Sequence, residues 1–343
     1  MNFVFSKKLK LFLILLNLHS IMYAQHEEKT NTVFARADSI AATYEASAIE
    51  NLPVLVHNLT ANLASKKEKF RAIYMWVSTH IKNDYYAYER VKKNHQKFSE
   101  DTTAFLKWNS KQFFKALRNI RKHQKASCTG YAYLIQHMAQ LANIECVIVN
   151  GYGKTATTLT YENSLPNHSW NAVFLENKWY LCDATWSAGK VVFDEGLPRF
   201  EFDYNDGFFL AEPSQFALNH YPLKKDWLLL NEPLSFEDFV ERPLVYNYAF
   251  QFGISPIKPL KMHNNIKFGT PFKIKLNTRE SIKYDLQLRI FKNGNSTTAN
   301  PKITVINDEI SITHTFLKTG LYDIHLLYNE KPIVTYVLEV YKN

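Results

Sequence analysis

The sequence predicts an α+β fold followed by an all-β region, and three observations lead to this prediction. Apolar residues recur at helical spacing in several stretches between residues 35 and 141. Three short strand-like runs follow at 145–151, 168–175 and 179–185. Beyond about residue 245, apolar and polar residues alternate. We therefore expect helices packed on an antiparallel sheet, and after them an immunoglobulin-like sandwich of about seven strands.

The helices of the first part have recognisable starts. Ser65 and Glu68 have the spacing of a capping box, which predicts that a helix begins here. Residues 89–109 are polar, and we expect them to form a variable loop. A helix should follow from Ser110. The next begins at Cys128, and its buried side is expected to consist of Leu134, Ile135, Met138 and Leu141.

The last two strands of the first part predict a specific register. If residues 176–177 form a two-residue hairpin loop, His168 lies opposite Thr185. Asp183 is then the diagonal neighbour of His168 on the same face of the sheet. A register shifted by one residue would place the two side chains on opposite faces.

The change in pattern near residue 245 predicts two domains. We expect the first to cover residues 25–240 and the β-sandwich to cover residues 245–343. Within the second, Asn293-Gly294 is typical of a tight hairpin turn between two strands.

Residues 1–24 have the pattern of a secretory signal peptide. Lys7, Lys8 and Lys10 precede an apolar run, and Ala24 stands at a plausible cleavage site. The apolar run is shorter than the roughly 20 residues that span a bilayer, so we expect no transmembrane segment after cleavage. The sequence therefore predicts a secreted or periplasmic protein.

The charge balance argues against a nucleic-acid-binding protein. The chain has a formal net charge of +9, and residues 1–24 hold three lysines and no acidic residue, which leaves +6 after cleavage. This excess is mild and spread along the chain, so we expect no nucleic-acid partner. One predicted helix has a basic face, either a solvated surface or a rim that favours acidic substrates or anionic wall polymers; it consists of Lys111, Lys115, Arg118 and Lys122.

The cysteine pattern favours thiol chemistry over a metal site. The chain has three cysteines, so an exported protein would keep at least one unpaired. Cys146 and Cys182 lie in apolar strand-like runs and are predicted to be buried thiols; a disulfide between them is the alternative. The sequence has no CxxC pair and no His cluster at zinc spacing, so we expect no metal and no cofactor.

Cys128, His168 and Asp183 are the candidate catalytic residues. A thiol attacks as the thiolate, and Cys128 stands at a predicted helix start, where the helix dipole stabilises negative charge. His168 opens a strand and can hold the proton, while Asp183 can orient the imidazole. The three residues therefore supply a nucleophile, a base and an orienting group.

Five segments contain these residues and their surroundings: residues 69–77, 128–132, 150–154, 168–173 and 179–186. Together they resemble the transglutaminase-like superfamily, in particular the bacterial branch similar to the kyphoscoliosis-peptidase group. The resemblance covers about residues 35–240. His220-Tyr221-Pro222 resembles the tail that follows the core in that branch, and we interpret His220 as structural.

The resemblance implies a papain-like fold in which Cys128 is the nucleophile, His168 the general base and then acid, and Asp183 the orienting residue. The implied chemistry is acyl transfer through a thioester. We therefore expect a secreted cysteine protease or amidase that acts on protein or peptide, cell-wall peptide included. The alternatives are a cross-linking transglutaminase and a non-catalytic binding or scaffold module for cell-surface polymers. Candidates for a second oxyanion donor, beside the backbone N–H of Cys128, are Trp108, Asn109 and Gln124.

Overall fold

The structure, a computed structural model, describes residues 33–98, 101–111, 113–156, 165–278, 285–306 and 309–342. The expected signal peptide, residues 1–24, lies outside the described residues. Among the described helices none is long and apolar enough to cross a bilayer.

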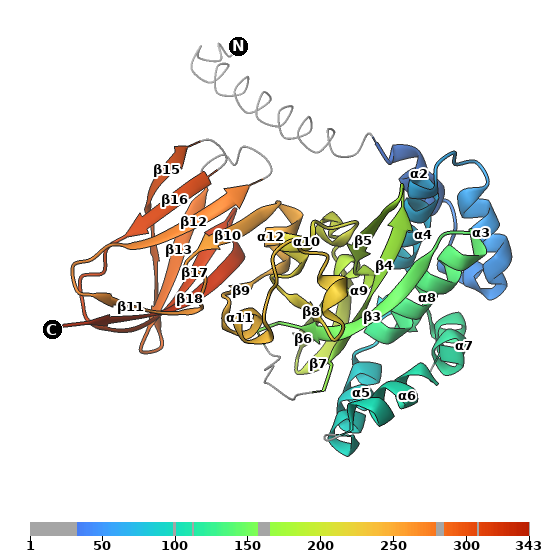
Figure 1. Ribbon diagram of the computed structural model, residues 1–343, viewed down its shortest axis with the longest axis horizontal. Helices are drawn as coiled ribbons and strands as arrows, with labels where there is room; N and C mark the ends of the chain where they lie inside the picture. Colours follow the sequence, from blue (N-terminus) through green and yellow to red (C-terminus); the bar gives the residue numbers. More distant parts are fainter. Residues whose placement is uncertain are drawn as a thin grey trace, which may run out of the picture.

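Helices dominate the first part of the chain (Figure 1). The helices before the central sheet are α2 (Ala35–Ala42), the 3₁₀ helix η1 (Ala46–Asn51), α3 (Leu52–Thr60), α4 (Lys66–His80), α5 (Tyr85–Lys97), α6 (Thr102–Ser110), α7 (Phe113–His123) and α8 (Cys128–Leu141). The later ones are short: α9 (Ala184–Ala188), η2 (Asp206–Phe208), α10 (Pro213–Phe216), η3 (Lys225–Leu228), α11 (Phe236–Glu241) and α12 (Asn247–Gln251).

A four-stranded antiparallel sheet with the order β5-β4-β3-β8 forms the centre of the first part. Its strands are β3 (Cys146–Gly153), β4 (His168–Leu175), β5 (Lys178–Cys182) and β8 (His220–Pro222). Two small sheets accompany it: β1 (Lys82–Asn83) pairs in parallel with β2 (Lys125–Ala126), and β6 (Gly189–Asp194) forms a hairpin with β7 (Leu197–Phe202).

The central sheet is buried on both faces. Val173 and Leu175 belong to a cluster with α4 and α8, in which Trp76 and Tyr131 are almost fully buried. Trp170 belongs to a second cluster, which continues into the C-terminal sheets. The expected α+β arrangement, with helices packed on an antiparallel sheet, is therefore confirmed.

The helix starts follow local sequence signals. Ser65 accepts the backbone N–H of Glu68 at 3.1 Å, and the Glu68 side chain accepts the backbone N–H of Ser65 at 3.0 Å, which is the predicted capping box at the start of α4. Helix α8 begins at Cys128 as predicted. Three of its four predicted core residues are buried, and Leu141, in the last turn, is 40% exposed.

The prediction that residues 89–109 form a loop is wrong, because most of them belong to α5 and α6. Although residues 89–109 are mostly polar, a few aromatic residues in and next to the two helices form a small cluster. Phe98, Phe105 and Trp108 have ring centroids 6.0–6.3 Å apart, which is enough to pack two short helices together.

The C-terminal region is a sandwich of a four-stranded sheet, β10-β12-β16-β15, and a six-stranded sheet, β11-β18-β17-β13-β14 with β9 beside β18 (Figure 1). The described residues contain more strands than the seven or so that the pattern suggested. Their bounds are β9 (Leu244–Val245), β10 (Ile254–Lys258), β11 (His263–Lys267), β12 (Phe272–Thr278), β13 (Leu286–Lys292), β14 (Asn295–Ala299), β15 (Lys302–Ile306), β16 (Glu309–His314), β17 (Gly320–Tyr328) and β18 (Lys331–Tyr341).

The predicted turn at Asn293-Gly294 connects β13 to β14. Both residues have positive φ, 49° and 77°, and Lys292 pairs with Asn295 across the hairpin. This is the conformation that a two-residue turn needs and that Asn-Gly adopts readily. The limits of the two domains, by contrast, stay a prediction, since one apolar cluster joins Trp170 and Phe216 to the sandwich residues Ile274 and Tyr336.

Candidate functional site

Helix α8 places Cys128 at its first position. Ser127 precedes it with extended backbone, φ −80° and ψ 173°, so the chain turns sharply from β2 into the helix. Close packing of α8 requires a small residue here: a Cβ on Gly130 would lie 3.0 Å from the Cβ of Ala126. The Cys128 side chain is only partly exposed, at a helix start whose unpaired N–H groups favour an anion.

His168 is the first residue of β4, and the sheet holds this strand against α8. The Asn171 side chain donates to the carbonyl of Ala132 on α8 at 2.9 Å and to the carbonyl of Val147 on β3 at 3.3 Å. These two bonds fix the helix that begins at Cys128 relative to the strand that begins at His168. Both side chains line the same small cavity and interact electrostatically.

Asp183 follows β5 directly, and its backbone setting differs from the predicted one. Leu175 pairs with Lys178, as the two-residue hairpin requires, but pairing between the strands stops at Asn171 and Cys182. The expected pair of His168 with Thr185 is absent, because Asp183 caps α9. Its Oδ1 accepts the backbone N–H groups of Thr185 at 2.8 Å and Trp186 at 3.3 Å.

The cap turns the Asp183 carboxylate directly toward His168. Oδ2 of Asp183 lies 2.7 Å from Nε2 of His168, and both side chains are buried. Since Nε2 faces Asp183, the other ring nitrogen, Nδ1, is left for the thiol of Cys128. The structure thus brings the three sequence-predicted residues together in the order Cys128, His168, Asp183.

In this cluster, the neighbouring charges and hydrogen bonds together shift each pKa more than burial does. Burial alone would raise the pKa of the Cys128 thiol, but the hydrogen bond and charge of His168 lower it below its ordinary value. Burial alone would lower the pKa of His168, but Asp183 and Cys128 raise it to about 10. Burial would likewise raise the pKa of Asp183, yet His168 and His220 hold it well below the usual range. His168 therefore favours the thiolate of Cys128 relative to an ordinary cysteine, and Asp183 favours the imidazolium of His168.

His220 is a fourth member of this cluster. Its Nε2 lies 3.1 Å from Oδ2 of Asp183, the oxygen that His168 also contacts. Our interpretation of His220 as structural did not include this contact. Nothing in the local sequence pattern around β8 indicates a contact with Asp183, which is 37 positions away. The likeness of residues 220–222 to the family tail was the signal available in the sequence.

His168, Asp183 and His220 together have the composition of a metal site, which the sequence spacing did not predict. One ligand atom from each lies within 4.8 Å of the others. The separations of 2.7 and 3.1 Å between nitrogen and oxygen are hydrogen-bond distances, however. In this arrangement, hydrogen bonds connect the two histidines to the Asp183 carboxylate.

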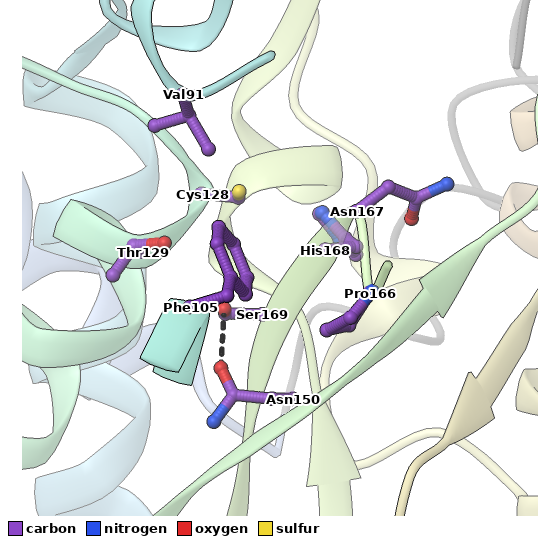
Figure 2. Close-up of a pocket in the computed structure, with 9 residues that line it drawn as sticks. All are labelled: Val91, Phe105, Cys128, Thr129, Asn150, Pro166, Asn167, His168 and Ser169. Carbon is purple, nitrogen blue, oxygen red and sulfur yellow. Dashed lines mark hydrogen bonds between the residues drawn. The ribbon is translucent and has the colours of Figure 1, made fainter. Parts of the chain in front are cut away.

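A small cavity opens beside Cys128 and His168 (Figure 2). Its volume is about 10 Å³, room for roughly one water molecule. Val91 from α5 and Phe105 from α6 line it, and Phe105 is only 3% exposed. The other lining residues include Thr129, Asn150, Pro166, Asn167 and Ser169, with the Ser169 hydroxyl donating to the Asn150 side chain at 2.8 Å.

Two of the proposed second oxyanion donors, Gln124 and Trp108, are not among the residues that line the cavity beside the thiol. The Gln124 side chain donates to the carbonyl of Arg121 at 3.1 Å, and Trp108 packs on Phe98 and Phe105. The side chain of Asn109 lies outside what the structure describes. The backbone of Ser169, by contrast, is among the groups that lower the pKa of the Cys128 thiol.

Removing the Phe105 ring should open the cavity to larger reagents. In Phe105→Ala we expect Cys128 to react with a bulky maleimide roughly tenfold faster than in the wild type, equivalent to about 1.4 kcal/mol of barrier. The rate with iodoacetamide should change little, because that reagent needs less space. Phe114→Ala is the matched control, since Phe114 is 76% exposed. Equal acceleration for both reagents would contradict a steric role of Phe105.

The other two cysteines differ from Cys128 in environment. Both are free thiols, so the structure does not contain the alternative disulfide. Burial raises the pKa of Cys146 to about 12 and that of Cys182 well above its ordinary value. Both are therefore neutral near pH 7, whereas the pKa of Cys128 is lowered.

Comparison with known proteins places this site in a family. Residues 54–184 match the sequence model of the Transglutaminase-like superfamily, and this segment includes Cys128, His168 and Asp183. The chain is 33% identical to kyphoscoliosis peptidase of Mus musculus over 210 residues, which are 60% of this chain and 28% of that protein. It is 26% identical to hillarin of Drosophila melanogaster over 232 residues, 64% of this chain and 26% of that protein.

Other similarities are more distant. The Lim and transglutaminase domain protein ltd-1 of Caenorhabditis elegans is 24% identical over 238 residues, 66% of this chain and 30% of that protein. Among solved structures, a TGase covers 49% of this chain and 37% of its own at 17% identity and a TM-score of 0.27. The Lin-41 filamin domain covers 26% of this chain and 92% of its own, at 12% identity and a TM-score of 0.22.

This chain spans less than a third of the length of the curated relatives described above. The family model matches residues 54–184, which include the candidate residues Cys128, His168 and Asp183. The chain therefore contains a domain of the transglutaminase-like superfamily.

Proposed function

We propose that this protein is a secreted transglutaminase-like cysteine protease or amidase that uses Cys128, His168 and Asp183. The observation that carries the proposal is that Cys128 and His168 line one cavity, that His168 hydrogen-bonds to the Asp183 carboxylate, and that His168 lowers the pKa of the thiol. An activated thiol at a helix start, paired with a histidine that a carboxylate orients, is the arrangement that acyl transfer to sulfur needs.

In the proposed reaction, the Cys128 thiolate attacks the carbonyl carbon of a peptide or side-chain amide. A C–S bond forms, and the carbonyl electron pair moves onto the oxygen. The backbone N–H of Cys128, which has no partner within α8, is suited to donate to this oxyanion. When the oxyanion collapses, the C–N bond breaks and the leaving amine takes the proton held by His168, which leaves a thioester on Cys128.

Water resolves the thioester in the hydrolytic reaction. Neutral His168 removes a proton from the water as its oxygen attacks the thioester carbon. The C–S bond then breaks, the carboxylic acid leaves, and Cys128 and His168 return to the thiolate and imidazolium forms. Asp183 keeps Nε2 of His168 in place through both steps.

A mass-spectrometric screen tests the proposal and separates it from cross-linking. Wild type, Cys128→Ala and the matched control Cys146→Ala would each be incubated with protein peptides, cell-wall peptides and a primary amine. We expect products from wild type and Cys146→Ala and none from Cys128→Ala, because Cys146 is buried away from the cavity. Water added to the cleaved amide means hydrolysis, while amine incorporated with loss of ammonia means transamidation.

Two outcomes would contradict the proposal. Product that persists in Cys128→Ala would remove Cys128 from the chemistry. The absence of any product from wild type, with retained binding of a cell-surface polymer, would favour a non-catalytic scaffold.

We also propose that residues 1–24 direct export and are then removed. The support is their charged start followed by an apolar run. Fractionation of producing cells, with N-terminal sequencing of the exported form, should give a chain that starts at Gln25. An intact N-terminus on a protein retained in the cytoplasm would overturn this proposal.

A further inference from the structure

His220 and His168 share one carboxylate oxygen. Nε2 of His168 lies 2.7 Å from Oδ2 of Asp183, and Nε2 of His220 lies 3.1 Å from the same atom. The side chain of His220 has no solvent exposure, and that of Asp183 is 1% exposed. No water therefore competes for this oxygen, and each contact must be a hydrogen bond with a proton on the nitrogen side.

The surroundings of His220 indicate which ring nitrogen has the proton. A carboxylate only accepts, so Nε2 must be the donor toward Asp183. Nδ1 lies 2.7 Å from the side-chain oxygen of Asn219, while the buried Nδ2 of Asn219 has no partner. In the opposite orientation the Asn219 amide N–H donates to an unprotonated Nδ1, and the Phe216 backbone, which raises the pKa of His220, is the other polar group beside the ring.

Aromatic rings hold His220 in this position. The ring of Phe216 is stacked on it with centroids 3.9 Å apart, and the ring of Trp186 lies 4.4 Å away. Burial is the largest influence on the pKa of His220 and lowers it to about 4, so the ring is neutral at working pH. A neutral, wedged imidazole can present a single fixed N–H.

We propose that His220 is a positioning residue, which donates its Nε2–H to Oδ2 of Asp183 and so holds the carboxylate ionised and aimed at His168. With this bond Asp183 accepts four hydrogen bonds: two at Oδ2 from the histidines, and two at Oδ1 from the backbone of Thr185 and Trp186. His220 acts on the thiol only through Asp183 and His168. Its effect on turnover rests on the proposed function, but its effect on the Cys128 thiolate does not.

The other titratable groups around the carboxylate are neutral near pH 7. Burial raises the pKa values of Tyr74, Tyr131 and Cys182 well above their ordinary values, and all three interact with Asp183. The charge on His168 therefore depends on Asp183 and Cys128. A substitution at His220 removes one hydrogen bond to Asp183 and leaves the side chains of Asp183 and Cys128 unchanged.

The pH dependence of Cys128 alkylation by iodoacetamide tests this role. His220→Phe keeps an aromatic ring against Phe216 but loses the N–H, whereas His220→Gln keeps an amide N–H near the place of Nε2. We expect the midpoint of the alkylation profile to rise by about one pH unit in His220→Phe, a tenfold lower thiolate population below the midpoint. His220→Gln should recover most of this shift. An unchanged midpoint in folded His220→Phe would overturn the proposal.

Nitrogen NMR of the wild type gives a second measurement that needs no variant to fold. In ¹⁵N-histidine-labelled protein, His220 should show a protonated Nε2 and an unprotonated Nδ1 between pH 5.5 and 8. A proton on Nδ1 alone would overturn the proposal. If these results hold while the wild type turns over no substrate, the proposed function fails and the role of His220 stands.

Discussion

Replacing Asp183 by Asn should lower the turnover of an acyl substrate by roughly 10³–10⁴-fold with little change in fold. An amide at this position offers an N–H to Nε2 of His168 in place of a negative charge. The ring then carries its proton on the side of Cys128 without forming an imidazolium. Turnover and the alkylation profile of Cys128 measure the two consequences.

The pH dependence of Cys128 alkylation shows whether the substitution raises or lowers the pKa of the thiol. In the wild type, His168 lowers the pKa of the Cys128 thiol, so alkylation should persist at pH values where an ordinary thiol, with pKa near 9, has stopped reacting. Without the charge of Asp183, the imidazolium loses its main partner and the thiol midpoint should rise toward the ordinary value.

The same substitution should flatten the pH dependence of stability. His168 has a raised pKa of about 10, so its contribution is complete below its ordinary value of 6.5 and is lost as pH rises through about 10. Asp183 has a depressed pKa, so its contribution is present above the ordinary value of 3.8 and is lost as pH falls further. The pair therefore stabilises the wild type most between those two ordinary values.

Asp194→Asn is the matched control for Asp183→Asn. It makes the same chemical change at a carboxylate that is 70% exposed on β6. Turnover, the alkylation midpoint and the pH dependence of unfolding should all stay close to the wild type. If Asp183→Asn behaves like this control, the carboxylate has no part in orienting His168.

Replacing Arg71 by Met should lower the free energy of unfolding by about 3–5 kcal/mol. Arg71 is 4% exposed on α4 and bonds to Asp38 through Nε at 2.6 Å and through Nη2 at 2.9 Å. It also bonds to Asp206, and its guanidinium lies 4.7 Å from the centroid of the Phe209 ring. Met keeps the apolar stem but leaves the Asp38 carboxylate in a largely buried place without its partner.

The loss should extend to the site, because Arg71 anchors η2. The carbonyl of Phe208, at the end of η2, accepts the backbone N–H of Asp183 at 3.1 Å. Urea unfolding measures the stability, with turnover recorded at a urea concentration where both proteins are folded. Lys67→Met on the same helix is the control: Lys67 forms a surface pair with Glu176 at 3.6 Å, and its loss should cost about 0–1 kcal/mol. Equal losses in the two variants would contradict this account of Arg71.

Local signals in the sequence predicted the elements that carry the site. The capping box at Ser65, the two-residue loop before Lys178 and the helix start at Cys128 each depend on residues close together in the chain. Propensity and capping act over such short distances, so they can be read without the fold. The same reading failed at α5 and α6, where a few aromatic contacts outweigh a polar composition.

The region around Asp183 shows where local reasoning ends. Period-two alternation continued the strand to residue 185, but the carboxylate caps α9 and thereby points at His168. Whether an aspartate continues a strand or caps a helix depends on what packs after it. Here the segment that includes Phe208 packs after Asp183, and the carbonyl of Phe208 accepts the backbone N–H of Asp183.

The sequence by itself was enough to predict the resemblance to the transglutaminase-like superfamily, the α+β order with a β-sandwich after it, and three candidate catalytic residues, because motifs and periodicity are local properties of the chain. Only the tertiary structure decided that His220 and His168 contact the same oxygen of Asp183 and that Phe105 lines the cavity beside Cys128. Contacts between residues tens of positions apart arise from how whole elements pack. No short-range pattern in the chain records them.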